Sequence, residues 1–505
     1  MRRGLIILFL LFCAGITVLA QTAPKREFRG AWIQAVNHQF EGIPTAELKA
    51  ELASQVETLS DCGITTVLFQ IRVEGDALYK SELEPWSAYL TGRQGKSPDE
   101  DWDPLQYMID ICHAHGMELH AWINPYRACT ASTKILAPTH QLSLHPERFV
   151  RYGDLVLFNP ALQENRDYIC SVAADIVTRY DIDGFHIDDY FYPYPENGLE
   201  FNDRADFLRD PRGFDNRDDW RRDNVNLFVE QLFRTVTELK PWVKFGISPF
   251  GIYRNASESC PDGSDTNGLE NYSGLYADVM YWLEKGWMDY CIPQIYWNVG
   301  YKVADYEILA NWWAQHSNGC LMYVGQDVER TVKGTSPDNA ADHQERYKMN
   351  LQRSMLDGSC HWPAKSVVDN PGHYRDILAT EYYQKPALQP VPERMNLKPR
   401  KVRRMRVVPT STGNVLFWTP PTAKSAADQA ARYVVYRFES GEKVNIDDAS
   451  HILCVTDRTY LPLDDSQDAA GCTYVVTSLT RVQAESKPVR CKVKSHIPAA
   501  AGTKE

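Results

Sequence analysis

The sequence lacks the usual features of a metal or redox centre. It contains no C-x-x-C pair and no Cys/His cluster at metal-ligand spacing, although it carries 12 cysteines and 13 histidines. His113 and His115 are two residues apart in a predicted helix, so their side chains do not share a face as a metal pair would. We therefore expect neither a metal nor an organic cofactor.

An excess of basic residues is also missing. The chain has 66 Asp and Glu residues against 54 Lys and Arg residues, which gives a net charge of -12 at pH 7. This balance argues against nucleic acid or an anionic membrane surface as the main partner, because both attract basic proteins. It is compatible with an enzyme that acts on neutral sugars, but it does not single out that class.

Long apolar runs are absent apart from one at the start of the chain. Arg2 and Arg3 precede the apolar run Leu5–Phe12, and Ala20 ends a stretch with the small residues of a cleavage site. The run is short for a spanning helix, so residues 1–20 are predicted to be a signal peptide and the mature chain to have no transmembrane segment. The bulky residue before Cys13 argues against lipid anchoring. We expect export to the periplasm or the extracellular space.

Short β-like segments alternate with amphipathic helical segments before residue 385. The clearest predicted helices are Thr45–Cys62, Pro104–His115 and Asn165–Tyr180. Strand followed by helix, repeated about eight times, predicts an α/β protein with a (β/α)8 TIM barrel over residues 25–384. The predicted strands are Arg29–Gln34, Thr66–Arg72, Glu118–Asn124, Gly184–Asp188, Lys244–Ser248, Tyr290–Tyr296, Cys320–Gly325 and a weaker eighth near Cys360.

A different kind of sequence follows the predicted barrel. Residues 385–400 hold four prolines and no apolar periodicity, which predicts a linker. Short alternating runs then predict a small all-β sandwich over residues 401–495 and a tail at 496–505. Several residues have the order seen in one such domain: Leu416, Trp418, Pro420, Tyr433–Tyr436 and Tyr474–Thr477. They resemble a fibronectin type III domain, which implies a spacer or a module that contacts the cell wall or another protein.

The predicted barrel strands become polar towards their C-terminal ends. Thr66–Arg72 has one aliphatic face, and its other face ends in Gln70 and Arg72. Because successive residues of a strand alternate between faces, the apolar face would pack under the helices and the polar one would point inward. The same alternation occurs in residues 118–124, 184–188 and 244–248. Polar residues at the same end of four strands predict an active site at the C-terminal mouth of the barrel.

The most informative segment is Asp181–Tyr194, in which two carboxylates end an apolar strand and aromatic residues follow. His186 and Asp188 are two residues apart and therefore point the same way, into the mouth. Asp189 points oppositely if the strand stays regular. Burial of a carboxylate is unfavourable unless it is hydrogen-bonded or used, so Asp188 and Asp189 are the predicted catalytic residues. The alternative role for each is to cap a loop.

Ten short motifs follow one another along the predicted barrel. They are Phe28–Ile33, Phe69–Arg72, Asp76–Tyr79, Pro85–Ser87, Leu90–Gly92, His120–Arg127, Asp183–Tyr192, Asp219–Arg222, Phe245–Gly251 and Pro293–Trp297. Together they resemble the glycosyl-hydrolase-like family 10 over roughly residues 27–385. The resemblance implies a TIM-barrel glycosidase, and a bacterial member of that family is a peptidoglycan glycosidase acting on glycan strands stripped of their peptides.

A second resemblance concerns the strand Gly184–Asp188. It is similar to the fourth strand of the α-amylase superfamily, where a basic residue stands two positions before the nucleophilic Asp; here His186 fills that place. Ser248 after the fifth predicted strand is not an acid, so the amylase arrangement does not transfer whole. The chain also has Val73 and Glu74 where we expect a proline-containing loop in relatives.

Cleavage of a glycosidic bond uses two carboxylates, about 5 Å apart for retention and roughly 6.5–9.5 Å apart for inversion. Orientation gives Asp188 the role of nucleophile or base. Its partner is left open between Asp189, should the strand break after Asp188, and acids on other loops, namely Glu74, Asp76 and Asp327. The predicted substrate-binding residues are Gln70, Arg72, Asn124, Tyr126, Arg127, His186, Tyr190, Ser248, Gln294, Tyr296 and Trp297.

The sequence thus predicts an exported glycoside hydrolase that cuts a polysaccharide by acid/base chemistry between carboxylates. The expected substrate, from the family resemblance, is a denuded peptidoglycan strand. Two alternatives stay open: another polysaccharide, and a glycan-binding barrel without catalysis.

Overall fold

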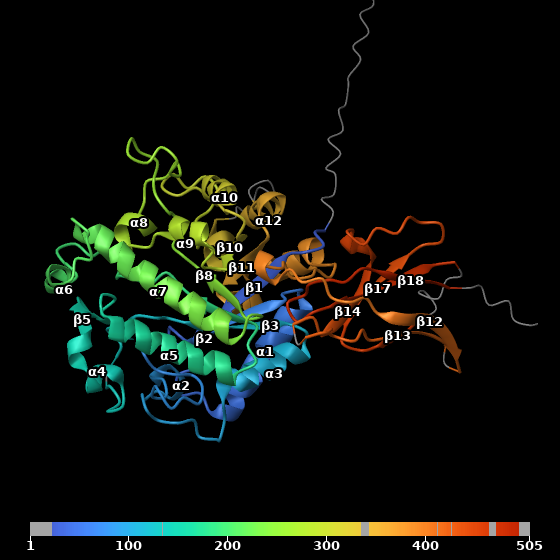
Figure 1. Ribbon diagram of the computed structural model, residues 1–505, viewed down its shortest axis with the longest axis horizontal. Coiled ribbons are helices and arrows are strands. Elements are labelled where there is room, and N and C mark those ends of the chain that lie inside the picture. The colour runs from blue at the N-terminus through green and yellow to red at the C-terminus, as the bar shows by residue number, and fades with distance from the viewer. Residues whose placement is uncertain are drawn as a thin grey trace, which may run out of the picture.

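The computed structural model describes residues 23–133, 135–334, 343–411, 413–425, 427–463 and 471–493. Figure 1 shows a large part with helices around a central sheet and, beside it, a smaller part made of strands. The predicted signal peptide and the predicted tail lie outside the described residues. Among the described helices, none has the length and apolar character needed to cross a membrane.

The large part is a closed barrel of parallel strands, as the sequence predicts. Its eight strands follow one another around the barrel in the order β1-β11-β10-β9-β8-β7-β3-β2. All eight predicted strands are present, although β9 is shorter than expected. The strands are β1 Phe28–Ile33, β2 Thr66–Arg72, β3 Glu118–Ile123, β7 Gly184–Ile187, β8 Lys244–Ile247, β9 Tyr290–Cys291, β10 Leu321–Asp327 and β11 Gly358–Trp362.

Helices surround the barrel, and the three clearest predictions match α1 Thr45–Asp61, α3 Pro104–Ala114 and α5 Gln163–Arg179. The start of α3 illustrates the local signals, because Asp103 caps the amide of Gln106 and proline opens the first turn. The other helices are α2 Ala88–Thr91, α4 Gln141–Leu144, α6 Arg204–Arg209, α7 Arg217–Leu239, α8 Asn271–Gly274, α9 Val279–Lys285, α10 Tyr306–Gln315, α11 Val328–Lys333, α12 Gln344–Met355, α13 Ala364–Asp369 and α14 Tyr374–Ile377. A small sheet of β4 Arg127–Cys129, β6 Leu155–Phe158 and β5 Phe149–Tyr152 follows β3.

The barrel has two apolar layers. The outward faces of the strands, for example Val67, Phe69 and Ile71 of β2, join the core under the helices. Leu68 and seven other residues form a separate cluster inside the barrel. Large aromatic side chains fill that interior, and glycines make room for them: a Cβ on Gly246 would lie 2.0 Å from the ring of Tyr290.

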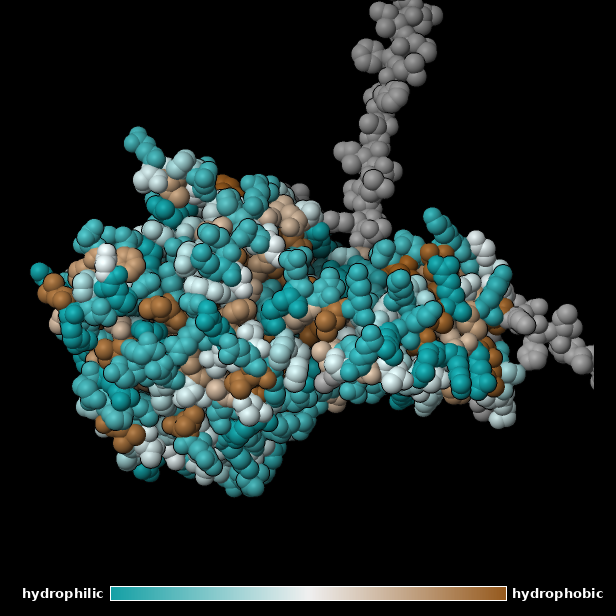
Figure 2. All heavy atoms as spheres, viewed as in Figure 1, coloured by the Kyte–Doolittle hydropathy of each residue, from teal (hydrophilic) through white to brown (hydrophobic). Residues whose placement is uncertain are grey.

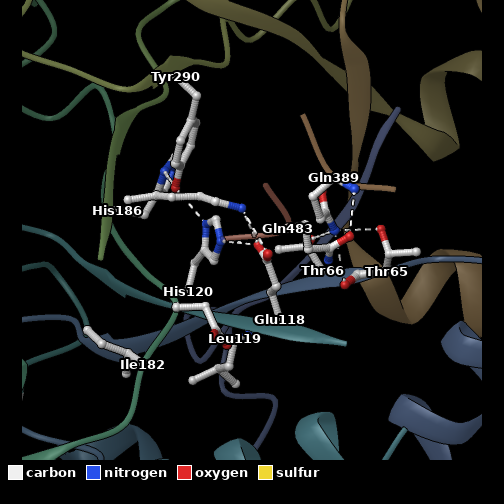
Figure 3. A network of polar contacts seen from close by, with 12 residues as sticks. Thr65, Thr66, Glu118, Leu119, His120, Ile182, His186, Tyr290, Gln389 and Gln483 are labelled. Carbon is white, nitrogen blue, oxygen red and sulfur yellow. Dashed lines mark hydrogen bonds and ion pairs between the residues drawn. The ribbon is translucent and has the colours of Figure 1, made fainter. Parts of the chain in front are cut away.

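A chain of polar side chains runs along the inside of the barrel (Figure 3). It begins at the N-terminal ends of the strands, where Lys244 pairs with Glu118 at 2.8 Å. Glu118 contacts His120 Nε2 at 3.2 Å, and His120 Nδ1 lies 2.8 Å from the hydroxyl of Tyr290. The same hydroxyl lies 3.2 Å from Nδ1 of His186. The chain therefore links the base of the barrel to the residue predicted to face the mouth.

The directions of the hydrogen bonds in this chain are set at its two ends, by the charge of Glu118 and by the indole nitrogen of Trp32, which can only donate and lies 3.5 Å from Nε2 of His186. Burial raises the pKa of Glu118, but Lys244 and His120 outweigh it, so the net pKa lies below the ordinary value and the group is an anion that accepts. His120 Nε2 must then donate to it, and His120 Nδ1 accepts from Tyr290. The Tyr290 oxygen in turn accepts from His186 Nδ1, because burial lowers the pKa of His186 far below its usual value and keeps that ring neutral.

The smaller part consists of two antiparallel sheets, β12-β13-β16 and β15-β14-β17-β18. Leu416 and Trp418 of one sheet and Tyr433 and Tyr474 of the other lie in one core cluster. The all-β region is confirmed, while its assignment as a fibronectin type III domain stays a prediction. Its strands are β12 Arg403–Thr410, β13 Gly413–Thr419, β14 Arg432–Phe438, β15 Ile452–Thr456, β16 Tyr460–Pro462, β17 Thr473–Leu479 and β18 Val489–Lys492.

The proline-rich segment between the two parts is packed against both of them. Arg394 forms an ion pair with Asp289 at 2.6 Å, and Gln389 donates to the hydroxyl of Thr66 at 2.7 Å. Leu388 is fully buried in a core cluster of the smaller part. The segment predicted as a linker is therefore held in the interface, because its long side chains find partners at the N-terminal face of the barrel. Figure 2 shows a mainly hydrophilic surface over both parts, with apolar residues in scattered patches.

We predict that Arg394→Met lowers the free energy of unfolding by about 1–3 kcal/mol, because it leaves the Asp289 carboxylate without its cation. Asp289 has a side chain that is only 2% exposed, whereas Arg394 is 29% exposed, which moderates the loss. Urea unfolding measures the change. The matched control is Lys398→Met in the same segment, at an exposed position. Equal stability of the two variants would contradict a structural role for the Arg394 pair.

We also predict that Tyr290→Phe destabilises the barrel by about 1–3 kcal/mol, because both histidines lose the partner of a buried ring nitrogen. The control is Tyr306→Phe, since the buried Tyr306 hydroxyl forms no hydrogen bond with any described residue. Thermal unfolding of the two variants compares them directly. A Tyr290→Phe protein as stable as the control would show that the polar chain contributes nothing to stability.

Candidate active site

A cavity of about 270 Å³ lies at the C-terminal mouth of the barrel. It receives residues from the ends of several strands, as in other barrels of this kind. Eight of the predicted site residues line it. Its lining comprises Trp32, Val36, Asn37, Gln70, Trp122, Arg127, Asp188, Asp189, Tyr190, Ser248, Gln294, Tyr296 and Trp362.

A larger cavity of about 800 Å³ lies at the opposite end, between the barrel and the smaller part. Its carboxylates are already engaged by cations: Glu118 pairs with Lys244, and Arg481 pairs with both Asp181 and Asp183. Carboxylates held in this way have structural partners rather than free oxygens for a substrate. The chemistry therefore points to the smaller cavity at the mouth.

Asp188 and Asp189 both line the cavity at the mouth. The sequence predicts opposite directions for them in a regular strand, but β7 ends at Ile187, one residue before the pair. The backbone then turns, with the amide of Phe191 donating to the carbonyl of Asp189 at 3.0 Å. The early end of the strand brings the two carboxylates together, which is the alternative in which Asp189 is the partner of Asp188.

Asp188 is held by the neighbouring strand β3 and the residue that follows it. The indole nitrogen of Trp122 donates to one carboxylate oxygen at 3.1 Å, and the amide of Asn124 lies 3.3 Å from the other. Burial, together with the charge of Asp189, raises the pKa of Asp188 to about 7. Hydrogen bonds and the nearby Arg127 oppose this shift without cancelling it. Asp188 therefore carries its proton up to neutral pH.

Asp189 is held from the other side. Gln294 Nε2 donates to it at 3.1 Å, and the hydroxyl of Tyr194 also donates to its carboxylate. Burial raises the pKa of Asp189, while these two hydrogen bonds favour the ionised form. Arg127 attracts both carboxylates and stacks over the ring of Tyr190 at 4.3 Å. The proton on Asp188 and the two donors to Asp189 thus place a carboxylic acid beside a carboxylate that is stabilised by hydrogen bonds.

Three polar residues form the floor and rim of the cavity. Ser248 Oγ lies 3.0 Å from Nε2 of His186, the last member of the polar chain inside the barrel. Because that nitrogen is an acceptor, the serine hydroxyl donates to it. Gln294 Nε2 also donates to the carbonyl of Ser248 at 2.9 Å. Gln70 accepts from the backbone amides of Ala35 and Val36 and so fixes the loop that follows β1.

Aromatic side chains form much of the wall, and sequence reasoning missed two of them. Trp362 packs edge-to-face against Trp32 at 6.4 Å and against Trp122 at 6.0 Å between ring centroids. Trp32 lies in the motif Phe28–Ile33, one residue before the end of β1. Trp362 follows the weakest predicted strand. In both cases a tryptophan at the C-terminal end of a barrel strand is the signal that could have found it.

The structure keeps three predicted site residues away from the cavity. Arg72 is fully buried in an ion pair with Glu84 at 2.7 Å, and it donates to two backbone carbonyls. Tyr126 is buried in the core against Phe228. Trp297 packs against Phe250 and the outer core. Two further predicted residues do not line the cavity but hydrogen-bond to residues that do: Asn124 to Asp188, and His186 to Ser248.

The three other candidate acid partners also lie outside the cavity lining. Glu74 accepts hydrogen bonds from the hydroxyls of Thr130 at 2.7 Å and Thr133 at 2.8 Å. Asp76 accepts from the amide of Gln94 at 3.0 Å. Asp327 caps helix α11 by accepting from the amide of Arg330 at 2.9 Å. Each of these carboxylates has a structural partner, so Asp189 is the acid that the structure brings to Asp188.

Among the residues that the structure describes, no group of three or more His, Cys, Asp or Glu side chains could hold a metal ion. The eleven cysteines after the predicted signal peptide are free thiols, and Cys62, Cys112 and Cys291 are buried.

Comparison with known proteins identifies the family of this chain. The model of the family described as Glycosyl hydrolase-like 10 matches residues 27–340. Glycosyl hydrolase YngK of Bacillus subtilis (strain 168) is 37% identical over 490 residues, which cover 94% of this chain and 95% of the relative. Glycosyl hydrolase DigH of Escherichia coli (strain K12) is 37% identical over 284 residues, which cover 54% of this chain and 64% of that protein.

Among solved structures, an endo-β-1,4-mannanase from Thermotoga petrophila is similar with a TM-score of 0.43 and 10% sequence identity, over 94% of this chain and 99% of that one. The family match covers more than half of the chain, and the Bacillus relative is matched over nearly its whole length. This chain therefore belongs to the glycosyl hydrolase-like 10 family and is a glycoside hydrolase.

Proposed function

We propose that this glycoside hydrolase is exported and cuts internal bonds of denuded peptidoglycan strands, with Asp188 and Asp189 as its catalytic pair. The observation that carries the chemistry is the presence of two adjacent buried carboxylates in an aromatic-lined cavity at the mouth of a TIM barrel. The predicted signal peptide supports export, and the family resemblance of the ten barrel motifs supports the substrate.

The two carboxylates take different roles in this proposal. Asp188, with a pKa of about 7, keeps a proton that it donates to the oxygen of the leaving sugar. Asp189 accepts hydrogen bonds from Gln294 and Tyr194, which favour its ionised form, and it supplies the negative charge beside the developing positive charge at the anomeric carbon. This assignment replaces the expectation from the sequence that Asp188 is the nucleophile or base.

The aromatic wall supports a glycan as the ligand. Sugar rings present apolar C–H faces that stack on indole and phenol rings, and Trp32, Trp122, Trp362 and Tyr296 supply such faces here. Tyr190 at the rim is 37% exposed and free to contact a neighbouring sugar. Peptide stems on the glycan would crowd this rim, so stripped strands are preferred in our proposal.

We predict that Asp188→Asn lowers turnover about 10³-fold or more while leaving the protein folded, because the amide keeps the shape and cannot donate the catalytic proton. In the unchanged enzyme, turnover should fall as the pH rises through about 7, where Asp188 loses its proton. Kinetics and melting temperature are measured together. The control is Asp327→Asn, which removes a carboxylate outside the cavity and should change turnover little, because asparagine also caps a helix N-terminus. Near-normal turnover of a folded Asp188→Asn protein would remove Asp188 from the mechanism.

The substrate is tested by offering the enzyme intact cell wall, amidase-treated wall and a panel of plant and host polysaccharides in separate incubations. We expect reducing ends to appear fastest from amidase-treated wall, because its strands carry no peptides. Size analysis of the products should show internal cuts. Faster release from any plant or host polysaccharide would overturn the peptidoglycan assignment, although the glycoside hydrolase activity would stand.

A further inference from the structure

The catalytic cavity has carboxylates on one side only. Among the described residues that line it, Asp188 and Asp189 are the two acids, and both directly follow the end of β7. Around the barrel, β11 stands opposite β7, with β1 next to it. These two strands contribute Trp362 and Trp32 to the cavity. The wall that faces the acids is therefore aromatic.

This arrangement conflicts with the usual pair of glycosidase carboxylates. Those groups flank the scissile bond from opposite sides, so that one protonates the leaving oxygen while the other acts at the far face of the anomeric carbon. Adjacent residues at one strand end approach a sugar from the same side. Glu74, Asp76 and Asp327 are held by hydroxyl, amide and backbone donors outside the cavity. The described part of the protein thus supplies an acid and a neighbouring anion but no carboxylate on the far face.

We propose that the substrate supplies the missing nucleophile, namely the carbonyl oxygen of a 2-acetamido group on the sugar that donates its anomeric carbon. This inference rests on the proposed glycosidase function and deepens it by naming N-acetylated amino sugars as the class that can react. A sugar with a free amine or a hydroxyl at position 2 lacks the reacting oxygen and is not cleaved efficiently.

The step balances with the two acids that the site contains. The acetamido oxygen forms a bond to the anomeric carbon as the bond to the leaving sugar breaks, and Asp188 gives its proton to the leaving oxygen. Asp189 accepts a hydrogen bond from the amide N–H and balances the positive charge of the oxazolinium ring. Water then attacks the anomeric carbon from the face that the leaving sugar vacated, and Asp188 takes the proton of that water. The acetamido group is restored and the anomeric configuration is retained.

The surroundings of the pair suit an acetamido group. Asp189 is fixed by Gln294 and Tyr194, so its carboxylate cannot rotate away from the amide that it orients. Trp122 holds Asp188 through its indole nitrogen and leaves its ring for the cavity wall. The indoles of Trp32 and Trp362 provide an apolar surface for the acetamido methyl group.

The test uses soluble denuded glycan strands in which the acetyl groups are removed chemically and replaced by acetyl, monofluoroacetyl or trifluoroacetyl groups. Fluorine withdraws electrons from the amide oxygen and leaves the rest of the strand unchanged. We expect turnover to fall stepwise, about 100-fold or more from acetyl to trifluoroacetyl, and free-amine strands to resist cleavage. The re-acetylated strand is the control for the chemical treatment, and NMR should show a product with retained configuration. Turnover that is insensitive to fluorination, or an inverted product, would overturn the inference.

A second measurement separates the roles of the two acids. With a dinitrophenyl glycoside of an N-acetylated oligosaccharide, whose leaving group needs no proton, Asp188→Asn should recover most of its turnover and Asp189→Asn should not. Added azide should yield no glycosyl azide of inverted configuration. A covalent glycosyl-enzyme ester found by mass spectrometry would overturn the inference while leaving the glycoside hydrolase function intact. If the unchanged enzyme cleaves no glycan at all, the proposed function itself fails and the inference fails with it.

Discussion

The buried ion pair between Lys244 and Glu118 is the constraint on which the interior of the barrel depends. It places a fixed negative charge at the N-terminal end of the strands, where both side chains are less than a tenth exposed. An anion in that position accepts from His120, whose other ring nitrogen accepts from Tyr290, and the Tyr290 oxygen accepts from His186 at the mouth. Strands β3, β9 and β7 are thereby held in one arrangement behind the candidate site.

The arrangement of Asp188 and Asp189 depends on a second constraint, the early end of β7. A strand continued by two residues would send Asp188 and Asp189 to opposite faces. The turn after Ile187 instead brings both to the cavity, where burial raises both pKa values and the charge of Asp189 adds to the rise at Asp188. The donors that flank them belong to different strand ends, since Trp122 comes from β3 and Gln294 follows β9. Both acids thus follow β7, while the side chains that hydrogen-bond to them come from other strand ends of the barrel.

The sequence predicts the barrel and the location of the site well, because both follow from alternation along single strands. It fails where a partner comes from a distant loop. Arg72 lies at the polar end of a strand, but it forms a buried ion pair with Glu84 that the local sequence pattern does not predict. The direction of the Asp189 side chain depends on the residue at which β7 ends, and alternation along the strand does not predict that residue. The sequence predicts a linker at residues 385–400, and the contacts of Arg394 and Gln389 with the barrel are not visible in its local pattern.

The direction of the polar chain also determines which ligands the mouth can discriminate. The Ser248 hydroxyl donates its only hydrogen to His186, so its oxygen can only accept hydrogen bonds from a ligand in the cavity. A sugar group that carries a hydrogen can satisfy that position, whereas an ether or a carbonyl oxygen there would meet another acceptor in a dry setting. The hydrogen bonds inside the barrel therefore decide which atoms Ser248 offers to the cavity, although His186 itself does not line it.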